Sequence, residues 1–216
     1  MTTPTFDRLR TALVVVDPYQ EFLSEGGRVW PRVREVAESV GTVRHLRELR
    51  AAARTAGIPM CIAPHRRYRS GDFAGWQHTN PPHRAIRDGR FFAVDSFGGQ
   101  WHPDLAPGPQ DIVASEHWGE NGFAHTDLDQ QLRQHGIDSI ILAGMTAPGC
   151  VEGTGRNGME LAYSITLVRD ATAAYSKEHL HATVDLNAQF WANAVLSTDE
   201  VIAALAVLGP VPTSEA

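Results

Sequence analysis

Short runs rich in apolar residues alternate with amphipathic stretches along this chain of 216 residues. The runs at 12–16, 59–63, 111–114, 139–143, 165–168 and 195–196 predict strands, several of them buried on both faces. Helices are expected at 32–56, after Thr126, and at 150–161, 178–194 and 199–208. Strands that alternate with helices indicate an α/β protein: a three-layer α-β-α, Rossmann-like fold with a mainly parallel sheet.

The periodic pattern dissolves between residues 64 and 110, where tryptophan, proline, glycine and histidine dominate. An irregular stretch of this length inside a compact domain is usually functional. We therefore expect residues 1–216 to form a single domain in which the 64–110 segment contributes part of a pocket.

Charge and composition narrow the class of partner. The formal net charge is -6 and no block of Lys or Arg interrupts it, which argues against nucleic acid. No apolar run is long enough to cross a membrane, and the first residues lack the pattern of a signal peptide, so a cytoplasmic location is expected. Cys61 lies inside an apolar run and is predicted to be a buried strand residue. A disulfide with Cys150 is possible but nothing suggests it, which favours a reducing compartment.

The carboxyl ends of parallel strands are where such folds bind ligands, and two residues there could carry chemistry. Cys150 ends the glycine-punctuated turn GMTAPGC between a strand and a helix. Amide groups at a helix start favour thiolate over thiol and can hold an oxyanion. Asp17 follows the first strand and could be a general base. The alternatives are a buried structural cysteine and an ordinary Asp-Pro turn.

Residues of the third strand's exit and of the irregular segment could surround a substrate. In a functional interpretation Glu116 lies near the thiol, and Trp118 and Phe123 surround the substrate. In the alternative, Glu116 is a solvated charge in a loop, and Trp118 and Phe123 are packing residues. Trp76 and Trp101 could cover a pocket or simply pack.

The sequence gives no sign of a metal or a cofactor. His65, His117 and His125 match no common metal-ligand spacing, so structural or polar-pocket histidines are expected and no metal. There is no G-x-G-x-x-G, P-loop or G-x-S-x-G motif, which argues against a nucleotide cofactor and a serine hydrolase elbow.

Four segments together resemble one family. They are TALVVVDPYQEFL at 11–23, GF followed by TDLD at 122–129, GMTAPGCVEGT at 144–154, and VRDA at 168–171. They run in order over nearly the whole chain, and each is weak alone. As a set they are similar to the isochorismatase-like cysteine hydrolases.

The resemblance implies a Rossmann-like fold, a nucleophilic Cys150 and an acid/base Asp17. It also implies a cis peptide bond between Met145 and Thr146, with the amides of Thr146 and Cys150 as an oxyanion hole. Members of the family are often homo-oligomers. Most cleave C–N bonds of amides or ureido compounds, whereas the namesakes cleave a vinyl ether. Specificity would come from a set of pocket residues: His65, Trp76, Trp101, Trp118 and Phe123.

One position departs from the family pattern. The usual triad contains a lysine after the third strand, and alignment places Glu116 there. Two carboxyl groups in one partly buried site repel, so we expect either Asp17 or Glu116 to be protonated at neutral pH. The missing lysine is also the one feature that supports a degenerate, non-catalytic binding protein.

The sequence therefore favours a cofactor-free cysteine hydrolase that cleaves an amide-like C–N bond of a small molecule through a thioester. The expected catalytic residues are Asp17, Glu116 and Cys150. A vinyl-ether hydrolase and the non-catalytic binding protein are the alternatives.

Overall fold

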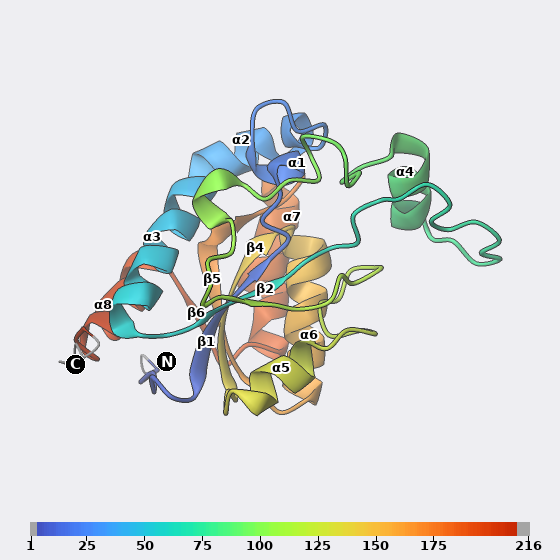
Figure 1. The fold of residues 1–216 in the computed structure, drawn as a ribbon. Helices are drawn as coiled ribbons and strands as arrows, with labels where there is room; N and C mark the ends of the chain where they lie inside the picture. The colour runs from blue at the N-terminus through green and yellow to red at the C-terminus, as the bar shows by residue number, and fades with distance from the viewer. Residues whose placement is uncertain (1–3, 211–216) are drawn as a thin grey trace.

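A computed structural model describes residues 4–210 of the chain (Figure 1). Its strands are β1 (Thr11–Val16), β2 (Met60–Ala63), β3 (Ile112–Val113), β4 (Ser139–Met145), β5 (Ser164–Ala173) and β6 (Ala194–Leu196). The α-helices are α1 (Gln20–Leu23), α2 (Trp30–Val40), α3 (Thr42–Ala56), α4 (Pro81–Gly89), α5 (Leu128–Gln134), α6 (Glu152–Glu160), α7 (Lys177–His181) and α8 (Thr198–Ala206). Four short 3-10 or π-helical turns complete the elements: η1 (Pro103–Leu105), η2 (Ala147–Val151), η3 (Ala182–Asn187) and η4 (Ala188–Phe190).

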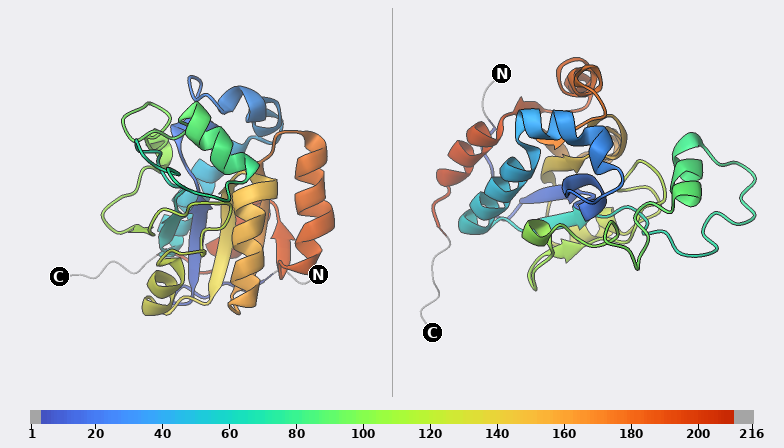
Figure 2. Two further views of the ribbon diagram at one scale, coloured as in Figure 1. Left: turned by 90° about the vertical axis from the view of Figure 1, so that its right-hand side faces the viewer. Right: turned by 90° about the horizontal axis from the view of Figure 1, so that it is seen from above.

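The six strands form one parallel sheet in the order β3-β2-β1-β4-β5-β6. Helices α2, α3 and α8 cover one face, and α5 and α6 cover the other (Figures 1 and 2). The predicted three-layer α/β fold is confirmed. Among the helices of residues 4–210, none combines the length and apolar character needed to cross a membrane.

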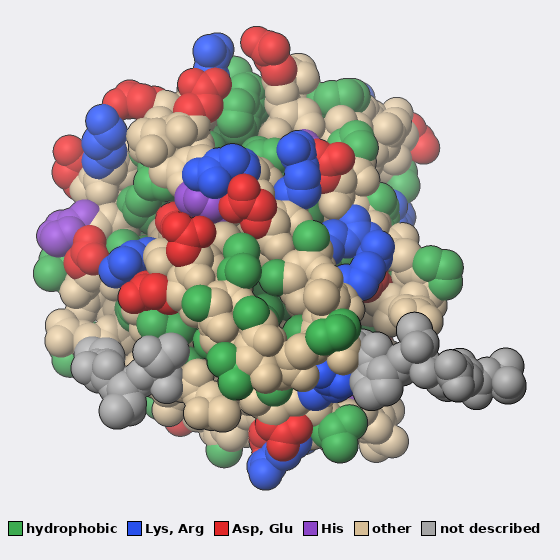
Figure 3. All heavy atoms as spheres, turned by 90° about the vertical axis from the view of Figure 1, so that its left-hand side faces the viewer, with side chains coloured by type: hydrophobic (Ala, Val, Ile, Leu, Met, Phe, Trp, Pro, Cys, Tyr) green, Lys and Arg blue, Asp and Glu red, His purple; other side chains and the backbone are tan. Residues whose placement is uncertain are grey.

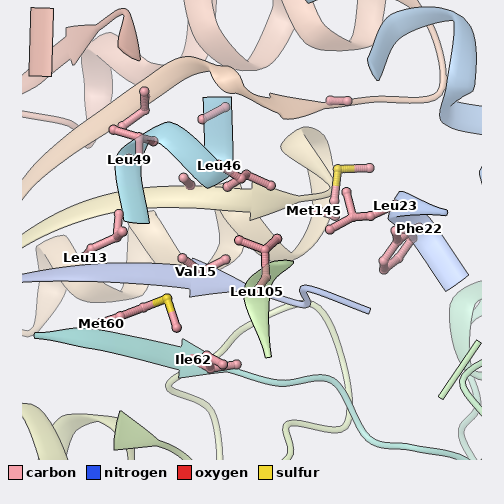
Figure 4. Close-up of a cluster of buried hydrophobic side chains, with 14 of the residues drawn as sticks. Leu13, Val15, Phe22, Leu23, Leu46, Leu49, Met60, Ile62, Leu105 and Met145 are labelled. Atoms are coloured by element: carbon pink, nitrogen blue, oxygen red, sulfur yellow. The ribbon is translucent and has the colours of Figure 1, made fainter. Parts of the chain in front are cut away.

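The continuous apolar runs arise because both faces of the sheet are covered. In β1, Leu13 and Val15 pack toward the α2/α3/α8 layer, whereas Val14 and Val16 pack toward α5 and α6. Figure 4 shows the first of these cores, where side chains of β1 and β2 meet Leu46 and Leu49 of α3. Cys61 packs in the second core, as predicted; burial raises its pKa to about 12. Both cysteines are free.

Two predicted helices differ in their limits. The helix expected at 32–56 is two helices, because Gly41 adopts φ +73° and turns the chain between α2 and α3. The helix expected at 178–194 is instead α7 followed by the short turns η3 and η4. The helix expected after Thr126 is α5, and Asp127 occupies its N-cap position.

The 64–110 segment is mostly irregular, and its main regular element is α4. Figures 1 and 2 show α4 and its flanking turns standing away from the body of the molecule. The buried carboxylate of Glu21 ties the segment to α1: it accepts hydrogen bonds from the backbone N–H groups of Arg28 (3.0 Å) and Phe92 (3.4 Å). The segment is therefore anchored beside the carboxyl end of β1.

Candidate active site

Asp17 lies directly after β1, between the carboxyl ends of β2 and β4. Its backbone N–H donates to the carbonyl of Ala63 (3.2 Å), which continues the β1–β2 pairing by one residue. Asp17 then adopts φ +51°, a left-handed conformation that Asp tolerates better than most residues. The side chain is completely buried. The first strand therefore ends by holding a carboxylate inside the protein.

Cys150 follows β4, which is the neighbour of β1. The peptide bond between Met145 and Thr146 is cis, as the resemblance implied. Cys150 lies in the π-helical turn η2, which continues into α6, and it is buried. Burial raises the pKa of its thiol well above the ordinary value, and the negative charge of Asp17 raises it further. The helix start was expected to favour the thiolate, but burial and the neighbouring carboxylate outweigh it.

The third member of this cluster is His117. Its Nε2 lies 3.1 Å from Asp17 Oδ1, and both side chains have no exposed surface. Its Nδ1 lies 2.7 Å from the carbonyl oxygen of Gly119. One ligand atom each from Asp17, His117 and Cys150 lie within 4.8 Å of one another. The structure thus gathers a thiol, a carboxylate and an imidazole in one buried place.

A bulge after β3 brings His117 there. The N–H of Ala114 donates to the carbonyl of Ile62, and the next matching bond runs from the N–H of His117 to the carbonyl of Pro64. The donors are three residues apart in the segment after β3, whereas the acceptors are two residues apart in the segment after β2. Such an extra residue moves each following side chain to the opposite side. Regular alternation from Ala114 would have turned Glu116 inward; the bulge turns His117 inward instead.

The placement of Glu116 beside Asp17 and the thiol is wrong. Its carboxylate accepts hydrogen bonds from Arg67 (2.6 Å), Arg69 (2.8 Å) and Arg66 (3.3 Å) in a separate surface cleft. Burial alone would raise the pKa of Glu116, but the hydrogen bonds from Arg69 and Arg67 lower it overall. Glu116 is therefore an ionised anchor for the arginines of the 64–110 segment, and the expected pair of competing carboxyl groups does not form.

A cavity of about 190 Å³ opens onto Cys150. Thr146 and Cys150 line its floor, and His65 lines it from the carboxyl end of β2. Its apolar walls come from α1, α2, α4 and the turn after α4. His65 packs against Phe92 and against the edge of His117. Burial, followed by the charge of His117, lowers the pKa of His65 to about 4, so it is neutral at physiological pH.

The other predicted pocket residues lie outside this cavity. Phe123 belongs to the core beside α5 and α6, where it stacks on Tyr163. Trp101 stacks on Tyr19 at 4.7 Å, and Trp118 lies under the guanidinium of Arg66. Trp76 is partly exposed and packs on Phe73 and Trp118. Trp101 and Trp118 line the separate surface cleft that also contains Glu116.

Sequence reasoning missed four polar residues of the site. His117 was expected to be a structural or polar-pocket histidine rather than a metal ligand, with no role beside Asp17 and Cys150. Arg32, Glu120 and Tyr175 line the cavity but carry no motif of their own, so no sequence signal marks them. An ideal Cβ on Gly149 would lie 3.3 Å from Glu120 Oε1, which shows how closely the Glu120 loop approaches the nucleophile turn.

Asp17, His117 and Cys150 also offer oxygen, nitrogen and sulfur donors, and within residues 4–210 they are the group of this kind close enough to share an ion. We assign no metal to them, because the Nε2–Oδ1 hydrogen bond already accounts for two of the three donor atoms. The group is suited to proton transfer beside a nucleophile.

A family model described as the isochorismatase domain matches residues 11–200. The match spans the whole sheet and the three residues of the cluster. The chain therefore belongs to the isochorismatase family of hydrolases, as the resemblance indicated.

Two relatives carry a named activity. Ureidoacrylate amidohydrolase RutB of Pseudomonas syringae pv. syringae (strain B728a) is 28% identical over 209 residues, covering 92% of this chain and 85% of the relative. RutB of Variovorax paradoxus (strain S110) is 29% identical over 172 residues, covering 75% and 68%.

Solved structures agree. A cysteine hydrolase from Pseudomonas syringae pv. phaseolicola 1448A superposes with a TM-score of 0.78 at 24% identity, covering 96% of this chain and all of that one. N-carbamoylsarcosine amidase from Thermoplasma acidophilum superposes with a TM-score of 0.67 at 26% identity, covering 88% and 97%. The first of these likenesses establishes the fold alone.

Proposed function

We propose that this protein hydrolyses an amide-like C–N bond of a small molecule through a thioester on Cys150. The observation that carries the proposal is a buried thiol that lines a cavity and lies within 4.8 Å of a buried carboxylate. Two relatives named ureidoacrylate amidohydrolase and one structural neighbour named N-carbamoylsarcosine amidase support the choice of a C–N bond.

In the first half of the reaction Asp17 acts as the base. Its Oδ2 has no hydrogen-bond partner within the described part of the chain, so it is free to take the thiol proton. Sulfur then attacks the substrate carbonyl carbon, a C–S bond forms, and the carbonyl π electrons move to oxygen. The N–H groups of Thr146 and Cys150 are proposed to hold this oxyanion. When the C–N bond breaks, the protonated Asp17 returns its proton to the leaving nitrogen.

In the second half a water molecule replaces the amine. Asp17 takes a proton from the water, whose oxygen attacks the thioester carbonyl carbon. The C–S bond breaks, the acid product leaves, and Asp17 returns the proton to sulfur. Asp17 therefore alternates between base and acid, which suits a carboxylate that a second group holds in place.

The cavity constrains the substrate. About 190 Å³ holds a small molecule only, and the walls beside α4 are apolar. The polar side chains of Arg32, Glu120 and Tyr175 at its rim would bind the substrate's polar end. We therefore expect small amides and ureido acids to be better substrates than peptides.

The test combines a substrate screen with a nucleophile variant. Small amides, ureido acids and isochorismate are incubated with the enzyme, and the products are identified by mass spectrometry. Cys150→Ala should abolish amide cleavage, and a trapped acyl group should add mass to the peptide containing Cys150. The matched control is Cys61→Ala, which removes the other free thiol, a buried residue of β2 that does not line the cavity. Turnover that survives in Cys150→Ala would favour ether hydrolysis, and a protein that binds these compounds without cleaving any would favour a non-catalytic role.

A further inference from the structure

The ring of His117 has two hydrogen-bond partners, and these partners determine where its protons lie. The carbonyl oxygen of Gly119, 2.7 Å from Nδ1, can only accept a hydrogen bond, so Nδ1 carries a proton. Nε2 faces Asp17 Oδ1 at 3.1 Å. A second proton must therefore lie between Nε2 and Oδ1, since two bare lone pairs at that distance would repel.

That proton belongs either to a carboxylic acid or to an imidazolium. Asp17 and His117 are both fully buried, and a buried carboxylate without a positive partner is costly. The described residues offer no other cation in contact with Asp17: the nearby arginines 66, 67 and 69 are bound to Glu116. His65, which touches the edge of His117, is neutral.

We propose that His117 carries both ring protons in the resting enzyme and supplies the positive charge that allows Cys150 to ionise. With His117 charged, the resting cluster of thiol, carboxylate and imidazolium has no net charge. After the thiol proton moves to Asp17, the cluster of thiolate, carboxylic acid and imidazolium again has no net charge. With a neutral His117 the buried cluster would carry a net negative charge both before and after the same transfer.

His117 is therefore a positioning residue that acts through Asp17: it holds Oδ1, while Oδ2 has no hydrogen-bond partner among the described residues and is left to accept the thiol proton. The titratable groups that surround it are Asp17 after β1, His65 after β2 and Cys150 after β4, while its neighbour Glu116 faces the arginines. This inference depends on the proposed function only for its kinetic consequence, because the state of the ring can be measured without any substrate.

The first experiment reads the ring directly. Long-range ¹H–¹⁵N NMR of the full chain at pH 7 should show both ring nitrogens of His117 protonated, and His117→Gln identifies the signal. His65 is an internal reference for a neutral ring. A His117 ring protonated on Nδ1 alone would overturn the proposal, whatever the enzyme turns over.

The second experiment reads the thiol. The rate of iodoacetamide alkylation of Cys150 is followed by peptide mass spectrometry from pH 6 to 10. His117→Gln should lower the rate at pH 7 at least about tenfold, since an opposite charge within reach shifts a pKa by about one unit or more. The rate should recover at higher pH. An unfolded variant would instead expose the thiol and react faster than the wild type at pH 7.

His117→Lys completes the test, because it keeps a positive charge at this position without the imidazole ring. It should restore the rate at pH 7 to within about threefold of the wild type. His135→Gln, an exposed histidine at the end of α5, is the matched control. Equal alkylation rates in wild type and His117→Gln would overturn the proposal.

Discussion

His65 shows how one buried side chain can make stability depend on pH. The imidazole has a pKa of about 4 in the folded protein, against an ordinary value of 6.5. As the pH falls below 6.5 the unfolded chain takes up a proton that the folded protein refuses. The contribution of the neutral His65 side chain to the free energy of unfolding is therefore complete above pH 6.5. It is lost as the pH falls from 6.5 to 4, by about 3 kcal/mol in total.

We predict that His65→Gln flattens this part of the stability curve. The free energy of unfolding, measured with urea at pH 7 and at pH 4.5, should fall less with pH in the variant than in the wild type. His135→Gln should leave the wild-type slope in place. An unchanged slope in His65→Gln would mean that the imidazole is already protonated in the folded protein.

At the residue scale the sequence placed Cys150 and Asp17 at the ends of neighbouring strands, where the structure has them, but did not identify His117 beside them. Cys150 and Asp17 follow central strands, and the apolar runs of the sequence show where these strands end. The choice between Glu116 and His117 depends on the bulge between Ala114 and His117. A bulge is a property of strand pairing, so no local pattern revealed it.

At the scale of elements, the close approach of β4 to β1 depends on a glycine. Gly144 pairs with Val16 and adopts φ +119°. An ideal Cβ there would lie 2.2 Å from the carbonyl oxygen of Val16, which is backbone and cannot swing aside. The ends of the two strands that carry Asp17 and Cys150 therefore meet only because this position has no side chain.

Gly144→Ala should lower the free energy of unfolding by more than about 2 kcal/mol and reduce the alkylation rate of Cys150. Gly75→Ala is the matched control: Gly75 also has a positive φ (+74°), yet nothing lies within 4 Å of its ideal Cβ. The control should show only the backbone strain, about 1 kcal/mol. Similar losses in both variants, measured by urea unfolding, would show that the contact with Val16 is unimportant.

The elements of the fold were predictable to different degrees. Buried parallel strands are recognisable in the sequence as continuous apolar runs, and four of the six runs form the central strands β1, β2, β4 and β5. The break between α2 and α3 was missed because the apolar residues before and after Gly41 keep the spacing of one continuous helix. The helical turns η3 and η4 were missed because their apolar spacing is also that of an α-helix.

At the scale of the whole molecule, the surface is mixed in character. Figure 3 shows charged side chains of both signs lying side by side on the face that α3 and α8 share. Elsewhere Leu186 and Phe190 expose large apolar side chains four residues apart, with Phe190 70% exposed. Exposed apolar pairs of this kind favour contact with another protein surface.

We therefore predict that the chain forms a homo-oligomer through the region of Leu186 and Phe190. Phe190→Asp should reduce the molar mass measured by light scattering after gel filtration. Leu9→Asp, which changes an equally exposed apolar side chain elsewhere, should not reduce it. An unaltered mass in Phe190→Asp would place the interface on another face, and a monomeric wild type would contradict the prediction outright.

The sequence by itself determined the layers of this protein, the order of its motifs and two of the three groups that meet at the site. These features were predictable because buried strands and their ends have characteristic local patterns of residue types. Tertiary structure decided the rest. Strand pairing with one extra residue turned His117 toward Asp17 and Glu116 toward three arginines, and packing placed four predicted pocket aromatics outside the cavity. These outcomes depend on contacts between segments far apart in the chain, which a one-dimensional pattern does not record.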